Sequence, residues 1–220
     1  MKLGNNLYLY PEQGMLDCNT YVIAGDPGMI IDPGNPDYLE YRLQRMKQDG
    51  IRPQDIGTIM NTHLHIDHCS ANGAFKEASG AKIVLPRVQK DNYQFVVIDS
   101  LKAFGMDSAA FTEDAVLGEN RVQIDGVVWE VINAPGHSPD CVCYYNREDK
   151  VLICGDVLFR MNTGRVDLPG GNADKLKATI ESLSRLDIEY LLPGHMDFVS
   201  GAADVRDNFE YIKGSVFPWL

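Results

Sequence analysis

The positions of the histidines constrain this 220-residue chain more than any other feature of its sequence. Each of the five histidines lies where an apolar, strand-like stretch passes into a loop. The segments are Thr62-His63-Leu64-His65-Ile66-Asp67-His68, Ala134-Pro135-Gly136-His137 and Leu191-Leu192-Pro193-Gly194-His195, and Ile153-Cys154-Gly155-Asp156 is another apolar stretch that ends in a carboxylate. A lone histidine is more often a hydrogen-bonded structural residue than a ligand, but this clustering favours a metal site.

Geometry divides these residues into two ligand sets. In an extended segment residues two apart point the same way, so His63 and His65 project together, and a turn into a helix redirects the next two side chains toward an adjacent point. We therefore predict a centre for two ions. The predicted ligands are His63, His65 and His137 for the first ion, Asp67, His68 and His195 for the second, and Asp156 as a bridge between them.

The donor types indicate the metals and the chemistry. Imidazole and carboxylate together suit two divalent ions, zinc first, with iron or manganese also feasible. Two such ions outweigh two aspartates and one bridging hydroxide by one positive charge, which attracts an anionic substrate and stabilises an oxyanion. Metal binding lowers the pKa of water from about 15.7 to about 7 and supplies a nucleophile. Asp67, Asp156 and His195 are the predicted catalytic residues.

Charge and cysteine content limit the classes of binding partner and the cellular compartments that we expect for this chain. The net charge of -11 disfavours nucleic acid and membrane surfaces, but it leaves an anionic small molecule as substrate. The N-terminus lacks the apolar run of a secretory signal, and no stretch has transmembrane length. Five scattered cysteines without a C-x-x-C pair indicate reduced thiols in a cytoplasm.

Turn residues and hydrophobic alternation predict an α/β domain over residues 1–220, with two sheets flanked by helices. Strands are expected at Leu7–Tyr10, Tyr21–Ala24, Met29–Ile31, Ile56–Met60, Lys82–Leu85, Arg121–Ile124, Val127–Ile132, Cys141–Tyr145, Val151–Cys154 and Tyr190–Leu192. Helices are expected at Tyr38–Met46, after His68 to about Ser79, at about Ala173–Leu186 and at Ala202–Ile212.

Two segments leave alternatives open. Residues 88–114 are long for a connection and predict a helical insert, which either packs on the body, caps the active site or contacts a second subunit. The apolar tail Val216–Leu220 either packs on the body or takes part in a homodimer.

The pattern His63-x-His65-x-Asp67-His68, followed by His137, Asp156 and His195, resembles the metallo-β-lactamase superfamily from about Leu7 to Met196. The resemblance implies a four-layer αββα sandwich with the metals at one edge of the two sheets. It also implies that Asp32, in Ile31-Asp32-Pro33-Gly34, orients a ligand histidine; a simple turn residue is the alternative. Flavodiiron-type members carry glutamate where this chain has His65, which argues against them.

Within that superfamily, Gly155–Phe159 and Gly164–Gly171 resemble the glyoxalase II-like branch, which hydrolyses S-acyl glutathione thioesters. The resemblance implies that Arg165 contacts the substrate. The aromatic glutathione contact two residues later is replaced by Asp167, and the C-terminal helical domain of that branch is absent, so the thiol carrier is left open. Phe159, a further substrate contact, stands where lactonases of the superfamily place tyrosine, which disfavours a lactonase.

The leading hypothesis is therefore a metal-dependent hydrolase of thioesters or related esters that uses a metal-bridging hydroxide. A persulfide dioxygenase with one iron resembles the same motifs and is the main alternative, ahead of a lactonase. A non-catalytic metal-binding or sensing protein is disfavoured by the intact ligand set. A nuclease is the weakest alternative, because the chain is acidic.

Overall fold

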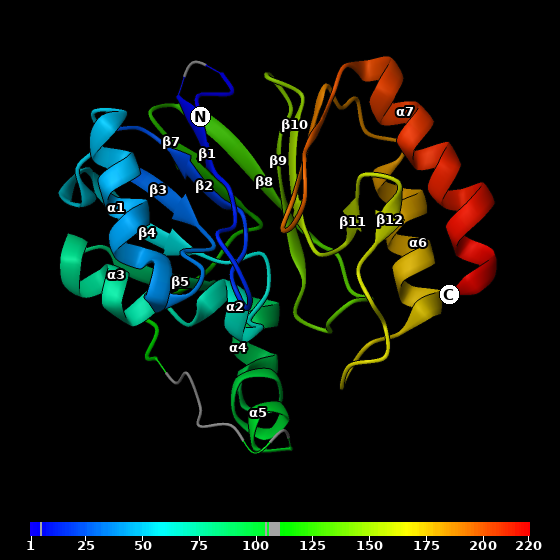
Figure 1. Cartoon of the computed structure of the whole chain (residues 1–220), viewed down its shortest axis with the longest axis horizontal. Coiled ribbons are helices and arrows are strands. Elements are labelled where there is room, and N and C mark those ends of the chain that lie inside the picture. Colours follow the sequence, from blue (N-terminus) through cyan, green and yellow to red (C-terminus); the bar gives the residue numbers. More distant parts are fainter. Residues whose placement is uncertain (5, 104, 106–110) are drawn as a thin grey trace.

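Two β-sheets face each other at the centre of the molecule, and helices cover the outer face of each sheet (Figure 1). The structure is a computed structural model and describes residues 1–4, 6–103, 105 and 111–220. The arrangement confirms the predicted α/β class and the four-layer αββα sandwich.

The first sheet has six strands in the order β1-β2-β3-β4-β5-β6. The first two pairings are antiparallel and the next three are parallel. Its strands are β1 (Leu7–Tyr10), β2 (Thr20–Ile23), β3 (Gly28–Ile31), β4 (Ile56–Met60), β5 (Lys82–Pro86) and β6 (Ala115–Leu117).

The second sheet has the order β14-β13-β10-β9-β8-β7, and within it only the β10–β13 pairing is parallel. Its strands are β7 (Arg121–Ile124), β8 (Val127–Asn133), β9 (Val142–Asn146), β10 (Val151–Gly155), β13 (Tyr190–Pro193) and β14 (Val199–Ser200). A separate small hairpin joins β11 (Leu158–Phe159) to β12 (Asn162–Thr163).

Helices α1 and α3 lie outside the first sheet, whereas α6 and α7 lie outside the second (Figure 1). The α-helices are α1 (Leu39–Gln48), α2 (Ile66–Cys69), α3 (Asn72–Ser79), α4 (Arg87–Tyr93), α5 (Ser100–Ala103), α6 (Ala173–Leu183) and α7 (Ala202–Tyr211). Shorter 3-10 or π turns are η1 (Pro36–Tyr38), η2 (Pro53–Asp55), η3 (Gln94–Asp99), η4 (Ile212–Val216) and η5 (Phe217–Trp219).

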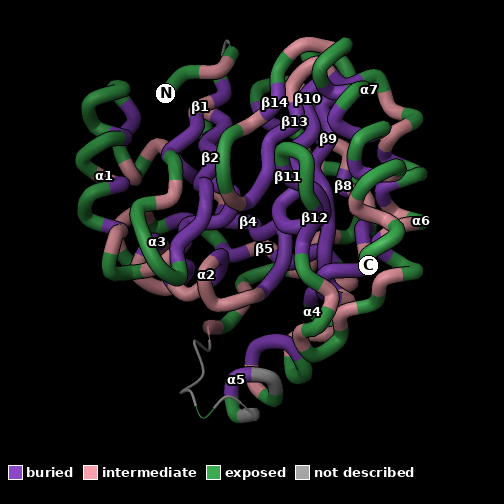
Figure 2. Tube along the Cα trace, turned by 45° about the vertical axis from the view of Figure 1, so that its right-hand side comes forward, coloured by how far each residue is buried: buried purple, intermediate pink, exposed green. Residues whose placement is uncertain are grey.

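Strand alternation sorts the apolar residues into three layers between the four structural ones. Tyr21 and Ile23 point between the two sheets, whereas Val22 points toward α1 and α3. Likewise Tyr144 faces the space between the sheets, and its neighbour Tyr145 faces α6 and α7. Figure 2 shows buried residues concentrated along the strands and exposed ones on the outer helices.

The predicted elements and the structure differ where the chain turns sharply. The helix expected after His68 is divided: α2 begins at Ile66, and α3 follows at Asn72 and ends at Gly80, whose φ is 78°. Such a left-handed φ favours glycine. The strands β6, β11, β12 and β14 were not predicted, because two or three residues are too few to reveal an alternating pattern.

The two segments with open alternatives take these positions. The described part of 88–114 is helical through α4, η3 and α5, and residues 104 and 106–110 of that insert lie outside the described residues. In the tail, Val216, Phe217 and Leu220 pack against the core beside α7, whereas the Trp219 side chain is 88% exposed. One domain over residues 1–220 stays a prediction. Among the described helices, none combines the length and the apolar character needed to cross a bilayer.

Candidate metal centre

The predicted ligand residues meet at one edge of the sandwich, where several strands end. His63 and His65 follow β4, and Asp67 and His68 lie on α2. The other three follow strands of the second sheet: His137 comes after β8, Asp156 after β10 and His195 after β13. The segment after β4 of the first sheet thus contributes four of these side chains, and loops after strands of the second sheet contribute three.

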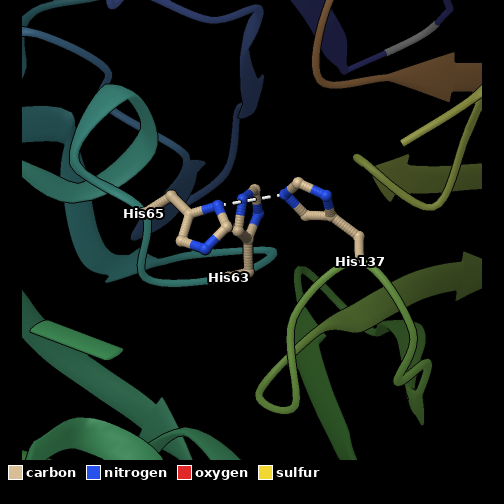
Figure 3. A group of neighbouring side chains, drawn as sticks. All are labelled: His63, His65 and His137. Atoms are coloured by element: carbon tan, nitrogen blue, oxygen red, sulfur yellow. Dashed lines mark hydrogen bonds between the residues drawn. The ribbon is translucent and has the colours of Figure 1, made fainter. Parts of the chain in front are cut away.

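The first predicted ligand set lies together. One ring nitrogen each of His63, His65 and His137 lies within 4.8 Å of the other two. Nε2 of His137 is 3.0 Å from Nδ1 of His65, and the three rings point toward one another from two separate loops (Figure 3). Three imidazoles converging in this way form one face of a coordination site.

The second set lies beside the first, and Asp156 lies between the two. One ligand atom each of Asp67, His68 and His195 also falls within 4.8 Å of the other two. The Asp156 carboxylate is 3.4 Å from Nε2 of His68, 3.4 Å from Nε2 of His195 and 3.7 Å from Nε2 of His137. Its two oxygens therefore face both sets, as a bridging ligand requires.

Hydrogen bonds fix the orientation of two histidines from the first half of the chain. Nδ1 of His68 lies 3.0 Å from the Asp32 carboxylate, which also accepts hydrogen bonds from the backbone N–H and the hydroxyl of Thr62. Nδ1 of His63 lies 3.3 Å from the Thr62 hydroxyl. Asp32 is fully buried and has a φ of 55°. Its contacts match the orienting role implied by the sequence, which we propose for it.

Two further contacts orient the histidines from the second half. Nδ1 of His137 donates to the Arg165 carbonyl at 2.7 Å, and Nδ1 of His195 lies 2.7 Å from the Glu12 carboxylate. Glu12 also accepts a hydrogen bond from the backbone N–H of Met196. Glu12 could not be selected from the sequence, because it is 183 residues from His195 and belongs to no motif. In each case Nε2 is left facing the centre.

Burial and nearby charge set the protonation of these groups. Burial lowers the pKa of His63 well below the usual imidazole value, and burial with the neighbouring His137 lowers the pKa of His65 to about 4. Both rings are therefore neutral at pH 7, the form that binds metals. Burial also opposes a charge on His195, but hydrogen bonds to Asp156, Asp67 and Glu12 raise its pKa to about 12. The carboxylates around His195 therefore stabilise positive charge on this side of the centre.

The donor atoms fit divalent cations. Among the described residues, Nε2 of His63, Nε2 of His68 and Oδ1 of Asp156 are buried and have no hydrogen-bond partner. An unpaired buried polar atom costs about 1–3 kcal/mol, so three within one cluster need partners. Cations held by imidazole and carboxylate at the two ligand sets would satisfy all three atoms.

Gly194 is required by this crowding. A Cβ atom at this position would collide with Oδ1 of Asp156 and with Cε1 of His68. The absence of a side chain lets the loop after β13 approach the centre closely enough for His195 to face Asp67 and Asp156.

A comparison with protein families agrees with this geometry. Residues 14–195 match the model of the metallo-beta-lactamase superfamily. The chain belongs to the metallo-β-lactamase superfamily. The match covers β2 to β13 and all seven predicted ligand residues.

The chain is also similar to individual proteins, among them the following three. A Methanocaldococcus jannaschii protein named "Probable metallo-hydrolase" is 30% identical over 202 residues, which cover 89% of this chain and 93% of that protein. The hydroxyacylglutathione hydrolase GloC of Haemophilus influenzae is 29% identical over 185 residues, 81% of this chain and 84% of the relative. A protein crystallised in a di-iron-bound form is 28% identical, with a TM-score of 0.72 over 90% of this chain and 98% of its own.

A cavity of about 530 Å³ opens directly onto the centre of this superfamily member, and it includes His65, Asp67, His137, Asp156 and His195 in its lining. The predicted substrate contacts Arg165 and Phe159 also line it. The Phe159 ring lies 6.1 Å from the His195 ring, and its side chain is nearly buried. Arg165 is exposed, and both Nε and one terminal nitrogen lie 2.6 Å from the Asp167 carboxylate. Their contact with substrate stays a proposal.

The Glu12 contact leads to a testable expectation. A Glu12→Gln variant should bind zinc about 10–100-fold more weakly than the unaltered protein, because partners that orient a ligand histidine typically contribute that much. Competition with a chromogenic chelator measures the affinity. Glu77→Gln, an exposed change on α3, is the matched control. Equal zinc affinity in the two variants would contradict a role for Glu12.

Proposed function

We propose that this chain is a metal-dependent hydrolase that cleaves a thioester or a related ester bond of a small molecule. One observation carries the proposal: seven proposed ligand residues converge, three of them have unpartnered buried atoms, and five of them line a cavity large enough for a small-molecule substrate. The similarity to a hydroxyacylglutathione hydrolase supports the thioester class.

The proposed ligands are those expected from the sequence. His63, His65 and His137 hold one divalent ion, Asp67, His68 and His195 hold the other, and Asp156 contacts both. When bound, such ions supply a hydroxide nucleophile at neutral pH and a Lewis acid for the substrate carbonyl. Zinc is our first choice, and the similarity to a di-iron protein keeps iron as an alternative.

Side chains of the cavity contribute to the other parts of the proposed hydrolysis. Asp67 and Asp156 both line the cavity and are the carboxylates that reach an attacking water. Burial opposes a charge on Asp67, yet His68 and His195 lower its pKa overall, so it is ionised at neutral pH and accepts a hydrogen bond from that water. Phe159 lies beside His195 and gives that side of the cavity an apolar surface. A thiolate then leaves without strong acid assistance.

A reducing compartment fits the cysteines. All five are buried and free of disulfides, so we propose a cytoplasmic location. The size of the cavity supports a small-molecule substrate. The proposed enzyme needs neither nucleic acid nor a membrane as partner.

The proposal is tested by metal-dependent thiol release. Protein stripped with a chelator is reconstituted with zinc or with iron, metal per chain is counted, and free thiol is measured with a panel of S-acyl thiols. We expect no release without metal and turnover with two ions per chain. One iron per chain together with oxygen uptake on glutathione persulfide would identify a dioxygenase instead. Metal-independent behaviour throughout would overturn the proposal.

A non-catalytic metal protein is separated from a hydrolase by Asp67→Ala. The substitution removes one proposed ligand and a carboxylate of the cavity. A binding protein retains its ligand affinity in this variant, whereas a hydrolase loses turnover.

A further inference from the structure

Most of the cavity wall beyond the metal-ligand side chains is apolar. Within the described part of the chain, eight apolar residues line it, contributed by the N-terminal loop, α2, the 88–114 insert, β11, the loop after β12 and the residue after His195. They are Leu16, Ile66, Val96, Leu101, Phe159, Leu168, Pro169 and Met196. Since these side chains come from six separate segments, the apolar wall surrounds the cavity and is not one stray patch.

The insert contributes to this wall directly. Val96 on η3 and Leu101 on α5 are 3% and 6% exposed, and both line the cavity together with His65 and Asp67. Val96 also belongs to the core cluster that contains β5 residues. The described part of the 88–114 segment therefore packs on the body and borders the cavity at the same time.

The wall offers little for an anionic group away from the metals. Among the described residues that line the cavity, Arg165 is the only lysine or arginine. Its guanidinium is already held by two hydrogen bonds to the Asp167 carboxylate, so the pair is neutral overall. A carboxylate on the substrate would have to displace Asp167 and gain nothing in net charge.

We infer that this site selects substrates with an uncharged, apolar acyl group of several carbons. The inference rests on the proposed hydrolase function and adds its substrate class. The carbonyl lies at the metal centre, and the acyl chain lies against Leu16, Leu101 and Leu168. Burial of each added methylene against this wall raises kcat/KM about fourfold until the cavity is filled.

The test uses thioesters of one neutral thiol, N-acetylcysteamine, with the metal-loaded protein. Acetyl, butanoyl and hexanoyl thioesters give the chain-length dependence. The succinyl thioester has the same number of acyl carbons as butanoyl, but a carboxylate replaces the terminal methyl group. We expect kcat/KM to rise about fourfold per methylene and the succinyl compound to be at least about tenfold poorer than butanoyl. A flat series, or a preference for succinyl, would overturn the inference. Absence of turnover on every compound would instead reject the proposed function.

Two substitutions distinguish the cavity wall from exposed apolar surface in general. Leu16 and Met161 have similar exposures of 47% and 52% and similar left-handed φ values of 57° and 58°. Only Leu16 lines this cavity. Leu16→Gln and Leu168→Gln should each lower the hexanoyl-to-acetyl ratio of kcat/KM, whereas Met161→Gln should leave it unchanged. An unaltered ratio in both cavity variants would contradict the inference.

The charge balance at Arg165 has its own test. Asp167→Asn removes the carboxylate but keeps the size of the side chain, so Arg165 becomes free for a substrate carboxylate. This variant should raise the succinyl-to-butanoyl ratio of kcat/KM, and a ratio that does not rise would contradict the neutralised arginine.

Discussion

Replacing Asp156 with asparagine is expected to reduce turnover by about 10³-fold or more, because the loss of about 4 kcal/mol of transition-state stabilisation has this effect on a rate. Asparagine has almost the same size, so the loop around Gly194 keeps its space. The negative charge between Nε2 of His68, His137 and His195 is lost, however. Five imidazoles and Asp67 would then hold the two ions without the carboxylate that lies between the two ligand sets.

Two measurements accompany the rate. Metal analysis should give fewer than two ions per chain in Asp156→Asn, and circular dichroism should give an unchanged secondary structure. Asp207→Asn on α7 is the matched control and should keep full activity and metal content. A folded Asp156→Asn protein with two ions and undiminished turnover would contradict the bridging role.

Replacing Asp17 with asparagine is expected to lower the free energy of unfolding by about 3–5 kcal/mol, the usual cost of leaving a buried charge without its partner. Asp17 and Arg42 form an ion pair at 2.8 Å whose side chains are 0% and 1% exposed. Asp17 also accepts hydrogen bonds from the backbone N–H groups of Gln13 and Asn35, and Arg42 donates to the Pro33 carbonyl. The pair therefore fixes the loop that carries Leu16 against α1.

Chemical denaturation of the metal-free protein measures this effect separately from metal binding. The control is Asp55→Asn, which disrupts the exposed pair between Arg52 and Asp55. Because water screens that pair, the control should unfold at the same denaturant concentration as the unaltered protein. If the two substitutions had equal effects, the Asp17–Arg42 pair could not be what holds the loop.

The sequence predicts most of the strands and the strand-end positions of the candidate ligand residues, because both depend on local patterns. Ile56–Met60 and Arg121–Ile124 agree with β4 and β7 at both ends, since alternation and flanking turns define a strand from its own residues. The ligand residues are recognisable for a related reason. Each lies at the end of an apolar stretch, and strand ends at one edge of the sandwich come together in the fold.

Contacts between distant segments could not be predicted in the same way. Glu12 contacts His195 in the same region where Asn19 and Tyr21, near the start of the chain, hydrogen-bond to the Pro193 carbonyl. Nothing within either segment encodes that pairing. The predicted substrate contact Arg165 lines the cavity and stays a prediction, but its pairing with Asp167, two residues away, comes only from the structure. A motif gives the residue type, but neighbouring charges decide whether the side chain is free.

The origin of the ligands in both halves of the chain affects more than chemistry. Four of the donors come from the half of the chain that builds the first sheet, and three come from the half that builds the second. Bound ions would therefore link the two halves of the chain. Only the closed sandwich presents all seven donors at once, and the unfolded chain does not. Folding is therefore coupled to cation supply: at a free ion concentration 100 times the Kd, each such site adds about 2.7 kcal/mol to stability. In a cell short of the metal, the protein would lose this contribution to its stability as well as its proposed activity.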